Sequence, residues 1–288
     1  MFSSLAKSAN LAYSIAKDHC RSNDGLSNDC SWYHGSWLFF RTLGLVSDPG
    51  IHKPLFIEGF KPLLKSDDFS RVLISGAVDY SMLATVLEIY QKNNTELDVT
   101  VVDICQTPLE LCQWYAKQQG EVINTITSDI LNFSSTELFD VICTHAFMGN
   151  FDKRQRLDLV SSWGSLLRIG GKVITVQRIR PGFNYKKARF SRQQARLFGD
   201  SVLQQAKKQS DLFLTEAVKI GAMAEEYAQK FFSYPVHSKE EIKQLFTNAG
   251  FIVEKLEVHQ FGEKNKSSLS GPTIPDLAEY AFIIAVKE

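Results

Sequence analysis

One stretch of the chain, from Arg71 to Asp103, restricts the possible folds more than any other. It opens with the apolar run 72–74, which is typical of a strand buried on both faces. Small residues follow, and an amphipathic helix is predicted from Tyr80 to about Gln91. A second apolar run, 99–102, ends on Asp103. Strand, tight turn, helix and strand ending in an acid form the first half of a nucleotide-binding α/β sheet, in which the acid takes the two ribose hydroxyls.

The turn after the first strand favours a ligand that has no phosphate. A pyrophosphate site needs further glycines and an uncluttered helix N-terminus, but Val78 and Tyr80 stand where glycines would be expected. Asp79 can cap the helix and places a negative charge at its start. That charge would repel a pyrophosphate but suits an ammonium or a sulfonium. S-adenosylmethionine (SAM) carries both groups and a ribose.

The stretch R-V-L-I-S-G-A-V-D resembles the first motif of the class I SAM-dependent methyltransferases, V-L-x-h-G-x-G-x-G, with two glycines replaced. Three further segments resemble family motifs in the same order: S-D-I after a strand at 122–126, F-D-V-I opening a strand at 139–145, and L-R-I-G-G-K-V from residue 167. The resemblance spans roughly residues 70–180. It implies SAM as cofactor, bound by Ser75, Gly76, Ala77, Asp79, Asp103, Ile104, Asp129, Ile130 and Thr144.

Within that set the resemblance gives two residues a role toward adenine. Asp129 would accept a hydrogen bond from the exocyclic amine, and Ile130 would pack on the ring. The alternative for Asp129 is an acid that caps a loop turn.

The predicted fold class is α/β, with a doubly wound, seven-stranded, mostly parallel sheet whose last strand is antiparallel. We divide the chain of 288 residues into four parts: a helical N-terminal extension or lid (1–70), a SAM-binding Rossmann-like core (71–180), a helical insertion after the fifth strand (181–236) and a C-terminal completion of the sheet (237–288). The insertion would provide a face that packs within the chain or forms a homodimer. Alternatively, it would be a lid that excludes water from the active site.

The segment from Ser31 to Arg41 is rich in aromatic residues and suits either of two roles. It can be a helix that packs aromatic rings onto the α/β core. It can also be a substrate wall, since aromatic faces attract cations and arginine holds carboxylates. The substrate-binding candidates are Trp32, Trp37 and Arg41, together with Phe147 and Arg178 beyond the fourth and fifth strands.

Three residues are candidates for the general base. His145 ends the fourth strand, where side chains point into the ligand crevice, and its ordinary pKa of about 6.5 lies near working pH. The alternative is a histidine that is hydrogen-bonded within the fold. Tyr33 and His34 could also accept the proton of an acceptor group.

Composition excludes several classes of partner. The 32 basic residues balance the 32 acidic ones, so the chain has no basic field for a nucleic acid. No apolar run approaches the roughly 20 residues of a membrane span, and no secretory leader is recognisable. The five cysteines show no C-x-x-C spacing, so we expect a cytoplasmic protein with no metal site, while a Cys20–Cys30 bridge stays open.

These observations predict a SAM-dependent methyltransferase that acts on a small molecule with an amine, hydroxyl or carboxyl acceptor. Two alternatives stay open. The chain could use another carbon of SAM, in a cyclisation or an aminocarboxypropyl transfer, or it could be a non-catalytic binding module. A nicotinamide-dependent oxidoreductase would have to tolerate Asp79 beside a pyrophosphate.

Overall fold

The predicted sheet is present in the computed structural model, which describes residues 2–20, 29–46, 49–65, 70–261 and 278–288. Its seven strands lie in the order β3-β2-β1-β4-β5-β9-β8, and β9 alone runs in the direction opposite to the other six. This confirms the fold class. The strands are β1 (Ser70–Ser75), β2 (Leu97–Asp103), β3 (Asn124–Thr127), β4 (Phe139–His145), β5 (Leu167–Ile179), β8 (Phe251–Phe261) and β9 (Ala278–Lys287).

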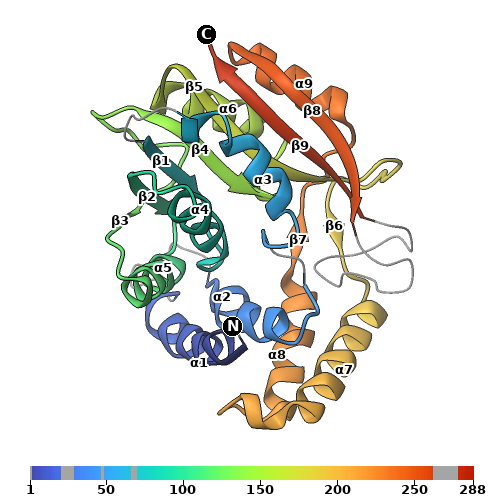
Figure 1. Cartoon of the computed structure of the whole chain (residues 1–288). Coiled ribbons are helices and arrows are strands. Elements are labelled where there is room, and N and C mark those ends of the chain that lie inside the picture. Colours follow the sequence, from blue (N-terminus) through green and yellow to red (C-terminus); the bar gives the residue numbers. More distant parts are fainter. Residues whose placement is uncertain (1, 21–28, 47–48, 66–69, 262–277) are drawn as a thin grey trace.

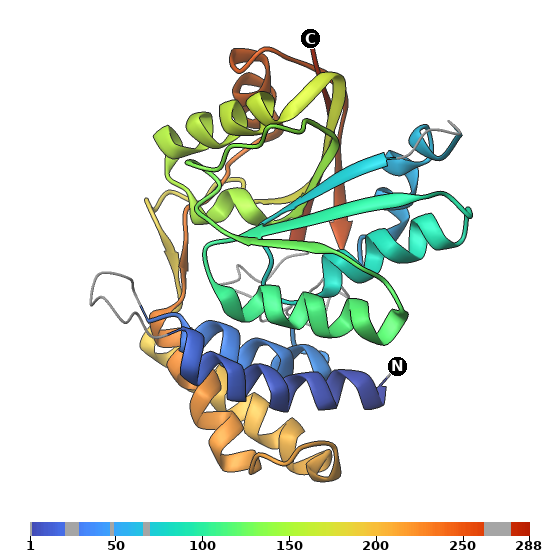
Figure 2. The same ribbon diagram turned by 90° about the vertical axis from the view of Figure 1, so that its left-hand side faces the viewer.

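Each face of the sheet carries its own apolar core, because neighbouring residues of a strand point to opposite faces. In β1, Val72 and Ile74 join one core while Leu73 joins the other. The first core is covered by α3 (Lys53–Phe60), α4 (Ser81–Gln91) and α5 (Gln106–Gln119), and the second by α6 (Lys153–Leu166) and α9 (Lys239–Asn248) (Figures 1 and 2). The central strands are therefore buried on both sides, as their apolar runs predict.

Four helices form a separate layer beside the carboxyl ends of the parallel strands (Figure 2). Two of these helices precede the predicted core (71–180) in the sequence, and two follow it. They are α1 (Phe2–His19), α2 (Ser31–Thr42), α7 (Arg192–Lys208) and α8 (Ala217–Lys230). The apolar face of α8 is buried within the chain, where Ile220, Ala224 and Tyr227 are fully covered. A short antiparallel ribbon of β6 (Ala188–Arg189) and β7 (Phe232–Ser233) connects the insertion to the sheet. Short 3₁₀ helices complete the chain at Leu63–Lys65 (η1), Phe147–Asn150 (η2) and Ser210–Leu212 (η3).

Local signals in the sequence fix several helix ends. Asp152 and Gln155 form a capping box at the start of α6, and Ser238 accepts a hydrogen bond from the Glu241 N–H at the start of α9. Gly120 ends α5 in the left-handed region, at a φ of 74°. Helix α4, which follows the turn after β1, begins at Ser81, one residue later than predicted. The side chain of its N-cap residue, Tyr80, makes no capping hydrogen bond. Asp79 nevertheless accepts the N–H of Ser81, so its carboxylate still serves the first turn.

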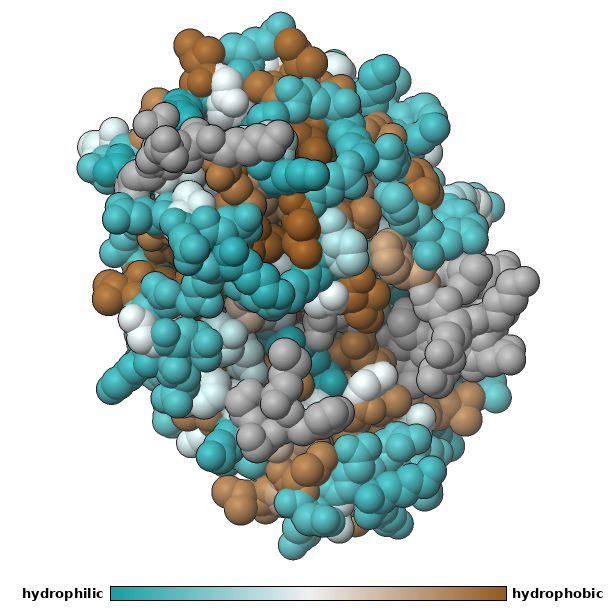
Figure 3. Space-filling view, in the orientation of Figure 1, coloured by the Kyte–Doolittle hydropathy of each residue, from teal (hydrophilic) through white to brown (hydrophobic). Residues whose placement is uncertain are grey.

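None of the helices in these ranges has the length and apolar character needed to cross a bilayer. In the space-filling view (Figure 3), most of the visible face is hydrophilic, and hydrophobic residues reach the surface in smaller, scattered areas.

Candidate cofactor and substrate site

A cavity of about 480 Å³ lies where the carboxyl ends of β1, β2 and β4 face the helical layer. Parallel strands place the residues that follow them at one edge of the sheet, so distant segments of the chain meet there. Most of the candidates line this cavity: Tyr33, His34, Trp37, Gly76, Ala77, Asp103, Ile104, Asp129, Ile130, His145, Phe147 and Arg178.

Asp103 is held in a fixed orientation at the floor of the cavity. One carboxylate oxygen accepts the Ala77 N–H at 2.9 Å, and the other accepts the Cys105 N–H at 2.8 Å. A carboxylate has about four acceptor positions, so two remain for a ligand. Burial raises the pKa of Asp103 to about 6, against the lowering effects of His34 and the two backbone N–H groups. The group is therefore ionised at neutral pH, and it suits a pair of hydroxyl donors.

Asp129 and Ile130 form the next part of the floor. The Asp129 carboxylate accepts the Leu131 N–H at 3.0 Å and a weaker bond from the Asn132 side chain at 3.3 Å. The turn-capping role considered for Asp129 is therefore present in the structure, and the same residue borders the cavity. Ile130 is 4% exposed and packs in the second core, so its position is fixed.

Gly76 allows the ring of Phe147 to lie close to its backbone. The close contact is therefore with a side chain of the protein and not with a ligand. Gly76 has a φ of +76°, and an added Cβ would lie 2.2 Å from the Phe147 ring. Only glycine fits both the backbone conformation and this contact. Phe147 follows Ala146, which has a positive φ of 52°, an uncommon conformation for a residue other than glycine.

Five of the predicted site residues do not border the cavity: Ser75, Asp79, Thr144, Trp32 and Arg41. Asp79 is 1% exposed and forms an ion pair with Arg41 at 3.3 Å. Its charge is therefore balanced within the chain, which weakens the argument that it repels a pyrophosphate. Arg41, in turn, is engaged with Asp79, so a substrate carboxylate would have to compete for it.

The aromatic segment of α2 proves to be both core and cavity wall. Tyr33 and Trp37 border the cavity together with Tyr227 of α8, and the rings of Tyr33 and Tyr227 are stacked with centroids 5.8 Å apart. Among the described residues, the buried Trp37 Nε1 and Tyr227 Oη find no hydrogen-bond partner. Buried polar atoms are normally paired, and these two are enclosed by the protein, so neither atom is exposed to the cavity. Tyr227 is not among the site residues predicted from the sequence.

His145 is paired with a second histidine that sequence analysis did not select. His52 Nδ1 lies 2.8 Å from His145 Nε2. His52 is fully buried, next to the rings of Phe261 and Tyr280. Burial, with smaller contributions from the charges of His145 and His259, lowers the pKa of His52 to about 3. His52 is therefore neutral at working pH and fixes the orientation of the His145 ring through one hydrogen bond.

The depressed pKa of His52 predicts that the protein loses stability in acid. The unfolded chain binds a proton at this residue below about pH 6.5, but the folded chain binds none until about pH 3, so stability falls across that window as pH falls. The titratable groups that face His52 are His145, His259 and Tyr280. Between pH 7 and pH 5 the contribution of His52 is a loss of about 2 kcal/mol.

Urea unfolding of the chain and of His52→Gln at both pH values measures this contribution, because the variant should lose that part of the pH dependence. His237→Gln is the matched control, since His237 is exposed. An unchanged pH dependence in His52→Gln would contradict the assignment.

Two arginines at the end of β5 border the opposite wall of the cavity. Arg178 and Arg180 follow one another on the same side of the strand, and burial lowers the pKa of Arg180 to about 9, with a smaller contribution from the charge of Arg178. Even so, both are cationic at neutral pH. They give this wall a positive potential that suits an anionic group on a substrate.

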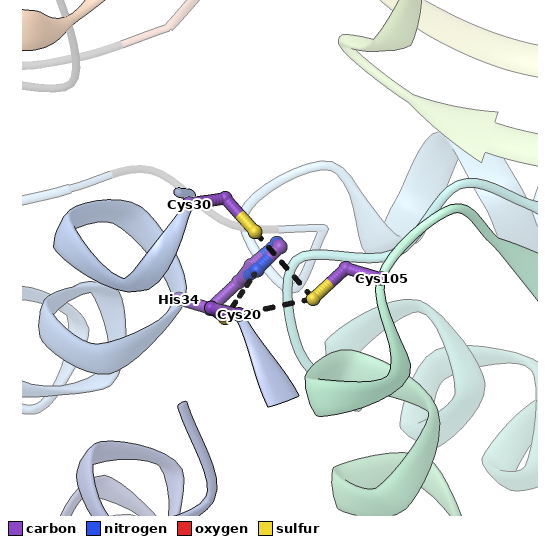
Figure 4. Close-up of side chains that lie close together, drawn as sticks. All are labelled: Cys20, Cys30, His34 and Cys105. Carbon is purple, nitrogen blue, oxygen red and sulfur yellow. Dashed lines mark hydrogen bonds between the residues drawn. The ribbon is translucent and has the colours of Figure 1, made fainter. Parts of the chain in front are cut away.

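The structure also brings together three thiols and an imidazole that sequence spacing did not connect. Cys20, Cys30 and Cys105 meet His34 at the junction of α1, α2 and α5 (Figure 4). All five cysteines are free, so the Cys20–Cys30 bridge is absent. The hydroxyl of Thr107, in the first turn of α5, contacts Cys20 Sγ at 3.2 Å. The signal available in the sequence was Cys-x9-Cys-x3-His.

No protein-family model matches the chain, and no curated protein matches it by sequence. Among solved structures, it is similar to magnesium protoporphyrin IX methyltransferase (ChlM) from Synechocystis PCC 6803, at 12% identity and a TM-score of 0.51 over 89% of this chain and 96% of that one. It is also similar to an S-adenosylmethionine-dependent methyltransferase from Clostridium acetobutylicum ATCC 824, at 10% identity and a TM-score of 0.52 over 87% and 96%. At these identities the similarity shows the fold: the chain has the α/β fold of SAM-dependent methyltransferases.

Proposed function

We propose that the chain is a class I SAM-dependent methyltransferase that acts on a small molecule. The observation that carries the proposal is Asp103, an ionised acid at the cavity floor with two acceptor positions left for a ribose. The order of the sequence motifs and the fold of two methyltransferase structures support it. The adenine would lie between Ile104 and Ile130, beside Asp129.

When bound, SAM supplies a methyl group on a sulfonium, and that group passes to the acceptor by direct displacement. The chain's part is to position the acceptor, which can lower the barrier by several kcal/mol, and to take a proton from an amine or hydroxyl acceptor. His145 is our candidate for the base. His145 borders the cavity, and its ring is oriented by the hydrogen bond between its Nε2 and His52 Nδ1.

The walls of the cavity indicate what the acceptor carries. An aromatic or apolar body would pack against Tyr33, Trp37 and Tyr227. Arg178 would pair with a negative group, such as a carboxylate, at the other end.

Calorimetric titration of the purified chain with SAM, S-adenosylhomocysteine and NADH tests the proposal. We expect micromolar binding of the first two and none of NADH. Binding of NADH alone would overturn the cofactor assignment, and so would the absence of any binding. Once an acceptor is found, the product separates methyl transfer, which releases S-adenosylhomocysteine, from use of another carbon, which releases methylthioadenosine.

Replacing His145 tests the base. In His145→Gln we expect turnover to fall by roughly 100-fold or more, the usual contribution of a positioned acid or base, while SAM affinity is unchanged. The readout is S-adenosylhomocysteine formation with the identified acceptor. His237→Gln, an exposed histidine, is the control. Wild-type turnover in His145→Gln would remove His145 as the base and leave Tyr33 as the next candidate.

A further inference from the structure

The four side chains at the junction of α1, α2 and α5 have the composition of a zinc site. Three are cysteines and one is a histidine, and their ligand atoms all lie within 4.8 Å of one another. Cys20 and Cys105 are 3% and 5% exposed and His34 is 7% exposed, so only Cys30 is partly open to solvent. Cys3His is one of the common ligand sets of structural zinc.

The distances within the cluster match tetrahedral coordination. Cys20 Sγ lies 3.6 Å from Cys105 Sγ and 3.6 Å from His34 Nδ1, and Cys30 Sγ lies 3.6 Å from Cys105 Sγ. A tetrahedral site with Zn–S bonds of about 2.3 Å and Zn–N bonds of about 2.0–2.1 Å requires S···S separations of roughly 3.8 Å and S···N separations of roughly 3.6 Å. A disulfide would require sulfur atoms only about 2.05 Å apart.

The surroundings of the cluster also suit a metal centre. The Thr107 hydroxyl lies 3.2 Å from Cys20 Sγ, where it can donate to a thiolate that a metal has already stabilised. Cys30 and His34 are four residues apart at the start of α2, which places both on one side of the helix. The side chains point toward one common centre from three separate segments (Figure 4).

We propose that Cys20, Cys30, His34 and Cys105 bind one structural Zn²⁺ ion. All four positions of a tetrahedral ion are then filled by protein atoms, which is the mark of a structural rather than a catalytic zinc. The ion would join the N-terminal helices to the start of α5, two residues beyond Asp103. It would therefore fix the segment whose Cys105 N–H donates to the Asp103 carboxylate. As a ligand, His34 would no longer be available as a general base.

Metal analysis of the full chain, purified under reducing conditions with any tag removed, tests the site without reference to methyl transfer. We expect about one zinc per chain by mass spectrometry of the metal content. Cys105→Ser and His34→Gln should lose it. Cys112→Ser should keep it, because Cys112 is a buried cysteine of α5, outside the cluster.

A second measurement needs no variant, so it tests metal binding even if the substituted chains fail to fold. Co²⁺ added to the metal-free, reduced chain should give the intense visible bands of a tetrahedral ion and a thiolate charge-transfer band, and an equal amount of Zn²⁺ should abolish both. Chelation should also lower the melting temperature. The proposal is overturned if the chain binds neither ion, if Cys105→Ser retains zinc, or if a Cys20–Cys105 disulfide forms in place of metal binding.

Discussion

Asp103→Ala should reduce the affinity for SAM by at least about 100-fold. The carboxylate would accept two ribose hydroxyls, and hydrogen bonds to a charged group contribute about 1.5–3 kcal/mol each. The substitution also releases the N–H groups of Ala77 and Cys105, which the carboxylate now orients toward the cavity floor. The measurement is calorimetric titration with S-adenosylhomocysteine, which cannot turn over.

Two further variants separate the ribose contacts from general damage. Asp103→Asn keeps the shape of the side chain but exchanges one acceptor oxygen for a donor, so we expect an intermediate loss of affinity. Asp98→Ala lies at the opposite end of β2, where its carboxylate meets Arg71, and should leave affinity unchanged. Affinity within about threefold of wild type in Asp103→Ala would remove the ribose assignment, since such a difference is less than 1 kcal/mol.

Arg156→Met should destabilise the protein by about 3–5 kcal/mol, which is the usual cost of removing one partner from a buried, hydrogen-bonded ion pair. Arg156 is 2% exposed, and its guanidinium pairs with Glu241 at 2.8 Å. It also donates to three backbone carbonyl groups, those of Met148, Tyr234 and Pro235. Burial lowers the pKa of Arg156, and the Glu241 charge opposes that effect. Without the arginine, the carbonyls of Tyr234 and Pro235 lose the donor described here, while the Met148 carbonyl keeps the Phe151 N–H and the Glu241 carboxylate keeps the His237 N–H.

Urea unfolding with an unchanged m-value is the measurement for Arg156→Met. Arg154→Met, on an exposed position of the same helix, is the matched control and should change stability by no more than about 0.5 kcal/mol. A loss below about 1 kcal/mol in Arg156→Met would show that the buried network is not a stabilising unit. Because Tyr234 and Pro235, whose carbonyl groups Arg156 holds, line the cavity, we also expect weaker ligand binding in this variant.

The sequence by itself determined the fold class and the floor of the site. Apolar runs specify strands buried on both faces, and each one alternates with an amphipathic helix, so a parallel sheet follows from local patterns alone. Once the strands are parallel, the residues after them must meet at one edge. For this reason Asp103, Asp129 and His145 could be placed at one crevice from their positions in the chain, and all three border the cavity. Their roles toward a ligand remain predictions.

Only the tertiary structure decided which side chains are partners. Asp79 meets Arg41 across 38 residues, Cys20 meets Cys105 across 85 and His52 meets His145 across 93. No periodic pattern links such positions, because helical and strand periodicities relate only residues within one element. These contacts depend on how the N-terminal helices lie against the sheet, and that arrangement is set by packing over many residues. The physical reason for the division is therefore range: local backbone preferences specified the elements, and the long-range fit of those elements specified the ion pair, the histidine pair and the thiol cluster.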